Sequence, residues 1–191
     1  MKSLFIAVLV FAVLAVGTTG SLAQPGKISF GIGADVAIPM SSGFKDSQSI
    51  GIGGTAKGYY ILNDMTSFTA TAGYMTFSGK DFTVAGTTAK ITAGSWNQIP
   101  VMVGARYYFG PAESKFRLYG AFELGLIFGS YTIPEQKING VVVIPSTSVS
   151  GSDFSYQPQL GFEASKFDVA ARFLGVSNAS SVAFRVGYIF N

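Results

Sequence analysis

The eleven residues Ile99–Phe109, IPVMVGARYYF, decide the fold of this chain. From Ile99 onward every second residue is apolar or aromatic, whereas the intervening positions include Gly104 and Arg106. Successive side chains of a β-strand point to opposite faces of a sheet, so this alternation predicts a strand with one apolar and one more polar face. An amphipathic helix would instead repeat its apolar residues every three or four positions.

The same two-residue period recurs in eight stretches that turn-rich segments separate. The predicted strands cover 27–39, 49–62, 66–78, 95–109, 115–131, 153–164, 167–176 and 181–190. Their connections are alternately long and short, except for the last one, which is short. Transmembrane β-barrels have short periplasmic turns and long extracellular loops. We therefore predict an all-β fold, an eight-stranded antiparallel up-and-down transmembrane β-barrel.

The charged residues within these strands all lie on the face opposite the apolar one. They are Asp35, Lys57, Arg106, Arg117, Glu123, Glu163, Asp168, Arg172 and Arg185, and three further charged residues, Lys27, Lys115 and Asp153, stand at strand ends. An arginine or lysine on the lipid face of a barrel costs about 2–4 kcal/mol at the bilayer midplane, which explains why the apolar face carries none. The polar face is also rich in glycine, and the lumen of eight strands is only just wide enough for side chains. We therefore expect the charges inside and the large apolar residues outside.

The charges in the lumen need partners, because an unpaired buried ion is costly. We predict a structural charge network that plugs the lumen, made of Arg106, Glu123, Glu163, Arg172 and Arg185. If the last turn is centred near residue 178 or 179, Arg172 and Arg185 lie opposite each other, and one of the two glutamates must separate them. The alternative role for such a network is an ion path or gate.

Aromatic residues gather near the predicted strand ends, where the two aromatic girdles of a membrane barrel lie. The expected girdle near the short turns includes Tyr59 and Tyr108, and the one near the long loops includes Phe77 and Trp96.

The first 23 residues have the features of a secretory signal peptide. Lys2 provides the positive charge, residues 4–16 form an apolar run, and small residues precede Gln24. We expect residues 1–23 to be the signal peptide and 24–191 to be the barrel domain. The apolar run would extend about 20 Å as a helix, which is short of the ~30 Å hydrocarbon core.

The composition excludes most catalytic schemes. The chain has no histidine and no cysteine, which removes imidazole and thiol chemistry and the usual disulfide and metal frameworks. The run 51–58 has the look of a phosphate loop, but it alternates as a strand and does not open a helix. We expect no enzyme activity, no catalytic residue, no cofactor, no metal site and no nucleic-acid partner.

Two segments carry a resemblance to a known family. Ile99–Phe109 and Phe184–Phe190 (FRVGYIF) resemble the fourth and last strands of the bacterial outer-membrane β-barrel proteins of the OmpA/OmpX-like kind, and the resemblance extends over 27–191. It implies a place in the bacterial outer membrane, with outer-membrane lipid and the barrel-assembly machinery as partners. It also implies a structural or surface-interaction role and excludes a general porin, because eight strands leave a filled lumen.

The long loops are the candidates for recognition. Loops 79–94 and 132–152 are expected to contain hairpins, one with Gly86 at its tip and one turning at Asn139-Gly140, and to contact an extracellular protein or surface partner. Two alternatives remain open. One is a secreted, soluble lipocalin-like barrel that binds an apolar ligand and has its apolar face inside; the other is a narrow ion channel.

Overall fold

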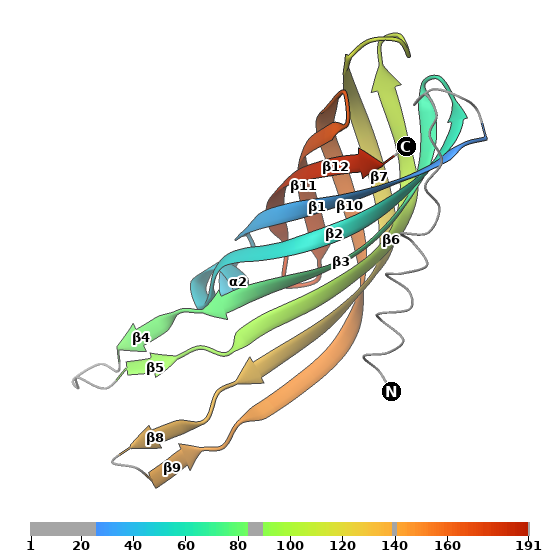
Figure 1. Ribbon diagram of the computed structural model, residues 1–191. Helices are drawn as coiled ribbons and strands as arrows, with labels where there is room; N and C mark the ends of the chain where they lie inside the picture. Colours follow the sequence, from blue (N-terminus) through green and yellow to red (C-terminus); the bar gives the residue numbers. More distant parts are fainter. Residues whose placement is uncertain (1–25, 84–89, 139–140, 191) are drawn as a thin grey trace.

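The computed structural model describes residues 26–83, 90–138 and 141–190 (Figure 1). The predicted signal peptide, 1–23, lies outside these residues. The long strands are β1 Ile28–Pro39, β2 Gln48–Asn63, β3 Thr66–Gly79, β6 Ser95–Phe109, β7 Phe116–Ile133, β10 Thr147–Ala164, β11 Phe167–Val176 and β12 Ser181–Phe190. The other elements are the helix α2 Ser42–Ser47 and the short strands β4 Asp81–Thr83, β5 Lys90–Thr92, β8 Gln136–Ile138 and β9 Val141–Ile144. Within the described ranges, no helix is long and apolar enough to span a bilayer.

The eight long strands form a closed antiparallel barrel in the order β1-β12-β11-β10-β7-β6-β3-β2. The barrel closes where β1 pairs with β12, from Phe30 opposite Phe190 to Pro39 opposite Ser181. The predicted fold class is thus confirmed. Hairpins β4-β5 and β8-β9 extend from one end of the barrel, which we call the loop end; the other, where β12 ends, is the turn end (Figure 1).

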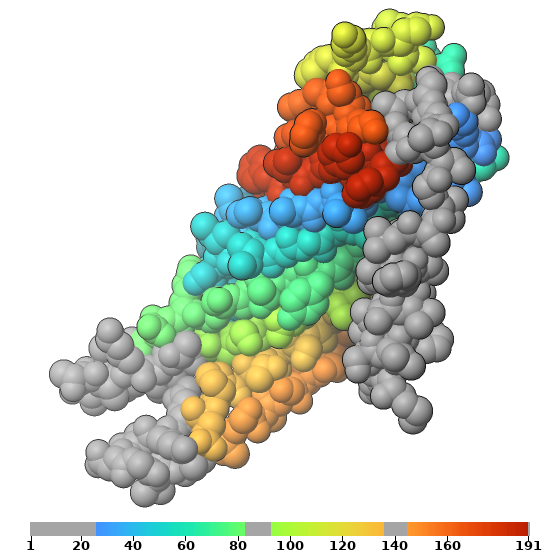
Figure 2. Space-filling view, in the orientation of Figure 1, coloured from blue at the N-terminus to red at the C-terminus, as the bar shows by residue number. Residues whose placement is uncertain are grey.

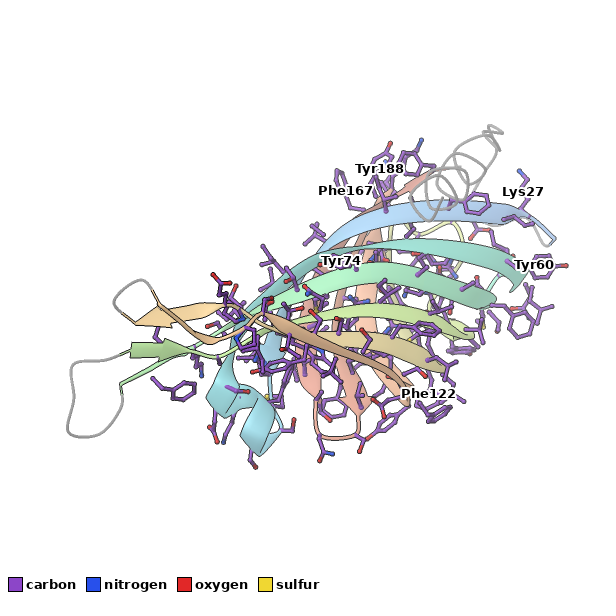
Figure 3. All side chains as sticks on the ribbon, turned by 90° about the horizontal axis from the view of Figure 1, so that it is seen from below. Lys27, Tyr60, Tyr74, Phe122, Phe167 and Tyr188 are labelled. Atoms are coloured by element: carbon purple, nitrogen blue, oxygen red, sulfur yellow. The ribbon has the colours of Figure 1, made fainter. Side chains whose placement is uncertain are left out.

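The two faces of the barrel wall have the expected character. The nine charged residues in the interior of the predicted strands are buried, none more than 7% exposed, whereas Lys27, Lys115 and Asp153 at the strand ends are not buried. The apolar residues of the same strands face outward, as Val103 at 63% and Leu160 at 69% illustrate. Labelled aromatic side chains such as Phe122 and Tyr188 point away from the barrel (Figure 3). A lipocalin-like barrel would need the opposite arrangement, so that alternative is wrong.

Several sequence-based details are corrected. Most predicted strand bounds agree with the structure within two residues, but β10 begins at Thr147, six residues earlier than expected. The last hairpin pairs Arg172 with Ala183 and Arg185 with Ala170, so the two arginines do not lie opposite each other. The turn is centred between residues 177 and 178 and not beyond 178, which shifts the register by two residues.

Three aromatic residues expected in the girdles lie inside the barrel. Tyr59, Tyr108 and Phe77 are at most 7% exposed, and Trp96 is partly buried against the interior cluster. Tyr59 shares its strand face with Lys57, so the two-residue period sends it inward with the charges. Aromatic character alone therefore does not identify the lipid-facing side.

Glycine allows neighbouring strands to approach closely in the barrel wall. A Cβ atom added to Gly104 in β6 would lie 2.6 Å from the Cα atom of Glu123 in β7, closer than real Cβ contacts allow. The two nearest atoms in the way belong to the backbone of β7, which cannot change rotamer to make room as a long side chain can. The wall at this point therefore requires a residue without a side chain.

We expect Gly104→Ala to lower the free energy of unfolding by about 1–3 kcal/mol, the cost of overpacking a well-packed site. Unfolding by urea in lipid bilayers, followed through the fluorescence of Trp96, measures this. Gly151→Ala in β10 is the matched control, because nothing lies within 4 Å of a Cβ atom placed there. Equal losses in both variants would contradict the argument from close approach.

Candidate functional site

The lumen contains two layers of different chemistry, and the polar layer lies toward the turn end. Arg106 is at its centre and is fully buried. Its guanidinium donates to Glu163 through Nη1 and to Asp168 Oδ2 at 3.2 Å through Nη2. The ring of Tyr119 lies 3.6 Å from the guanidinium carbon and that of Tyr59 lies 4.7 Å away. Charge pairing and aromatic faces thus surround this cation on several sides.

The Asp168 carboxylate accepts hydrogen bonds from four side chains, one of which is Arg106. Arg185 Nη1 donates to Oδ2 at 2.5 Å, and the hydroxyl groups of Tyr119 and Tyr59 donate at 2.5 and 3.1 Å. Together with Arg106, four side chains from β2, β6, β7 and β12 converge on one carboxylate. Asp168 therefore links walls of the barrel that are far apart in sequence.

Two further ion pairs complete the polar layer. Lys57 Nζ lies 3.1 Å from Glu123 Oε1, and Thr69, Thr71 and Gln157 also donate to the Glu123 carboxylate. Arg172 donates to Asp35 at 2.6 Å. Neither pair joins neighbouring strands: Lys57 and Glu123 connect β2 to β7, and Arg172 and Asp35 connect β11 to β1 past β12, so both pairs link strands that share no backbone ladder.

The structure brings the five predicted network residues into one layer but not into one mutual cluster. Arg106 and Glu163 contact each other directly, as expected. Glu123 pairs with Lys57, Arg172 with Asp35 and Arg185 with Asp168. Sequence reasoning had placed Asp35, Lys57 and Asp168 in the lumen but not in the network. Their inward position was visible in the strand period, whereas their cross-lumen pairing depends on how the barrel closes.

Glycines provide the space for Arg185. A Cβ atom on Gly33 would lie 2.7 Å from its Nε atom, and one on Gly187 would lie 2.7 Å from its Cζ atom. The guanidinium therefore lies against bare backbone of β1 and β12. From there, its Nε donates to Thr55 Oγ1 at 2.9 Å, and Thr55 donates to Asp35 at 2.8 Å. This hydroxyl connects two of the ion pairs.

The second layer is apolar and fills the lumen at the loop end. Its buried members are Ala37, Phe44, Met75, Phe77, Met102, Ile127, Leu174, Val176, Ala179 and Ala183, with Trp96 packed against them. Phe44 comes from α2, and its ring centroid lies 4.9 Å from that of Phe77 and 6.2 Å from that of Trp96. The sequence analysis missed this layer, because Phe44 falls in a connection without strand periodicity.

A small polar cavity lies at the turn end of the lumen. Its volume is about 20 Å³, and its lining includes Arg117, Glu163 and Asp64. This is room for about one water molecule. Arg117 donates to the Asp64 carbonyl and lies 4.0 Å from the Tyr108 ring centroid. With charges in the middle and apolar side chains beyond, the described part of the lumen is packed along its length.

One wall of the barrel extends beyond the other at the loop end. β10 pairs with β7 along its whole length, from Thr147 opposite Ile133 to Ala164 opposite Phe116. Its pairing with β11 begins only at Ser155. Residues 147–154 are all exposed, and among the residues that the structure describes no strand pairs with their second edge. Eight residues of β10 thus present an open strand edge beyond the barrel.

The predicted hairpins are present in both long loops. β4 pairs with β5 within loop 79–94, and β8 pairs with β9 within loop 132–152. Their expected tips, Gly86 and Asn139-Gly140, lie outside the described residues. Both hairpins extend from the same end of the molecule (Figure 1), and the space-filling view shows β12 and β1 side by side in the barrel wall (Figure 2).

Comparison with known proteins agrees with this architecture. The sequence pattern of the outer membrane protein beta-barrel domain family matches residues 9–190. Ail, the attachment invasion locus protein of Yersinia pestis, solved with the heparin analogue sucrose octasulfate, is similar at 18% identity and a TM-score of 0.53, covering 87% of this chain and 100% of Ail. Neisserial surface protein A is similar at 15% sequence identity and a TM-score of 0.53, and the match covers 85% of this chain and 96% of that protein. No curated protein sequence matches the chain.

Proposed function

Because the chain belongs to the outer membrane protein β-barrel domain family, we propose that its filled barrel anchors a surface-interaction site in the membrane. The chain is an integral β-barrel protein of the bacterial outer membrane. In such barrels the short turns face the periplasm and the longer loops face outward. The loop end, with the open edge and both hairpins, is therefore the surface that an external partner meets.

The open edge of β10 at residues 147–154 is the observation that carries this proposal. An exposed strand edge binds an extended segment of a partner through main-chain hydrogen bonds, and the side chains beside it give specificity. Val149 is 67% exposed and Phe154 is 63% exposed along this edge, so a partner can make apolar contacts in addition to main-chain hydrogen bonds. A packed lumen holds the edge on a rigid support, which reduces the ordering cost of binding.

Charge at the loop end favours backbone pairing over recognition of a polyanion. The segments there carry equal numbers of bases and acids, Lys45, Lys80, Lys90 and Lys137 against Asp46, Asp81, Glu135 and Asp153. Ail was solved with a sulfated heparin analogue, but a balanced surface does not concentrate anions. We therefore infer an extended polypeptide as the partner class.

The filled lumen supports a role without transport, and we assign the chain no catalytic activity. The ion pairs and the apolar layer together leave no wide passage through the described residues. Outer-membrane lipid surrounds the barrel in this proposal, and the barrel-assembly machinery is the partner that inserts it. The lumen charges act as a structural plug.

Adhesion of expressing cells tests the proposal. A non-adherent strain that expresses the chain is expected to bind to an epithelial cell layer, and Val149→Lys is expected to return binding to the vector background, because an edge lysine blocks strand addition. Ser177→Lys, an exposed position at the same end, is the control and should bind as wild type. Surface display is checked with Ser152→Cys, which a membrane-impermeant maleimide should label on intact cells. The chain has no other cysteine.

Two results would overturn parts of the proposal. If displayed wild type gives no gain in adhesion, the surface-interaction role fails and a structural role remains. If Val149→Lys adheres as well as wild type, the β10 edge is not the contact.

A further inference from the structure

A groove of about 460 Å³ lies on the outer, lipid-facing wall of the barrel. It is lined by residues of β1, β2, β11 and β12, including Ile32, Ala34, Gly54, Phe167, Val186 and Tyr188. The lining consists of glycine, alanine and larger apolar or aromatic residues, a chemistry that suits a hydrocarbon chain.

Two aromatic rings mark the end of the groove nearest the turn end. Phe167 and Tyr188 lie opposite each other in the β11–β12 ladder, with ring centroids 5.7 Å apart in an edge-to-face arrangement. Both point outward from the barrel wall (Figure 3). Aromatic side chains at this level lie at headgroup depth in membrane barrels.

A lysine, Lys166, lies at the same end of the groove. The Nζ atom of Lys166 lies 6.0 Å from the Tyr188 ring centroid. The turn that carries it is held on both sides: the Ser165 N–H donates to the Lys115 carbonyl at 2.9 Å, and the Ile189 N–H donates to the Lys166 carbonyl at 2.8 Å. Ser165 adopts a φ of 56°, which L-residues adopt rarely and only where the surroundings hold them. The backbone of this turn is thus held in place, and the exposed side chain of Lys166 extends from it beside Tyr188.

We propose that this groove and Lys166 together form a binding site for one phospholipid of the inner leaflet. One acyl chain lies in the groove over Ala34 and Gly54, and the lipid phosphate pairs with the Lys166 ammonium. The turn end faces the periplasm, where the outer membrane presents phospholipid headgroups. A cation beside an apolar groove at headgroup depth complements the two chemical parts of such a lipid.

A second copy of the chain fits this groove less well. A two-fold contact places the same surface of both partners together. Two concave grooves facing each other would enclose an empty space, and unfilled space loses packing energy. A flexible acyl chain fills the groove without this cost.

Native mass spectrometry of the folded protein with phosphatidylglycerol tests the site. Wild type is expected to retain one lipid molecule. Lys166→Ala should weaken binding about fivefold, the loss expected for one lysine near an anionic surface. Gly54→Leu should abolish the retained lipid by filling the groove. Its Cβ atom would meet only the Gly33 carbonyl oxygen, at 3.4 Å, so the variant should fold.

Matched controls separate a site from general lipid adhesion. Gly58→Leu also points outward from β2, but Gly58 does not line the groove. Lys115→Ala removes an exposed lysine from the neighbouring turn at the same end. Both should retain lipid as wild type does. Equal binding by all variants, equal loss in the controls, or a wild-type dimer that Gly54→Leu dissociates would each overturn the proposal.

Discussion

Asp168→Ala is expected to lower the free energy of unfolding by about 3–5 kcal/mol, the cost of breaking a buried ion pair by removing one partner. The carboxylate accepts from Arg106, Arg185, Tyr59 and Tyr119, and it is fully buried. Among the residues that the structure describes, its removal leaves Arg185 with no carboxylate partner and Arg106 with Glu163 alone. Two tyrosine hydroxyl groups lose their acceptor as well, and each unmet buried donor adds to the cost.

Urea unfolding in lipid bilayers measures this loss, and the heat-dependent shift in gel mobility confirms that the variant has folded beforehand. Asp153→Ala, an exposed aspartate of β10, is the control and should change stability by less than about 0.5 kcal/mol, as surface substitutions do. Glu163→Ala should lower the unfolding temperature by a smaller amount, because Arg106 keeps Asp168. A stability loss for Asp168→Ala no larger than that of Asp153→Ala would show that the polar layer does not brace the barrel.

Phe77→Ala is expected to destabilise the barrel by about 3–5 kcal/mol, as large-to-small aromatic substitutions in packed cores do. Phe77 is fully buried at the centre of the apolar layer, and its ring contacts Phe44 of α2 edge to face. In this variant the polar layer, on the turn-end side of Phe77, still closes the lumen. We therefore expect wild type to pass no steady ionic current in planar lipid bilayers, and Phe77→Ala to pass none either.

Phe82→Ala is the matched control for this prediction. Phe82 lies in β4 beyond the barrel and is 46% exposed, so its loss should leave the stability of the barrel unchanged. Steady conductance of Phe77→Ala would show that the apolar layer alone seals the lumen. Steady conductance of wild type would support the ion-channel alternative.

The sequence predicted what depends on strand period and missed what depends on closure. Arg106 and Glu163 were placed inside because each lies on the polar face of its own strand. The ion pair of Lys57 with Glu123 joins β2 to β7 across the lumen, and no local sequence pattern indicates that these two side chains meet. Phe44 was missed because a single aromatic residue in a six-residue helix has no periodicity to reveal its direction.

The start of β10 was missed for a different reason. Residues 147–152, TSVSGS, have no apolar stripe, since neither face is covered in the structure. Periodicity reports burial on one face, and a strand that is exposed on both faces does not produce it. Six of the eight residues that carry the proposed function therefore lie in a strand segment that a hydrophobic pattern does not detect.

The closure of the barrel between β1 and β12 has a consequence for how the protein is made. Seven of the eight strand pairings join neighbours in the meander, but Phe30 must find Phe190 at the far end of the chain. Closing so long a loop costs entropy, and contacts of high sequence separation form slowly. Until β12 has been delivered, the growing sheet has two unpaired edges, which invite misassembly. The barrel therefore closes only when the last strand pairs with the first, and a chain that stops at residue 180 would remain an open sheet.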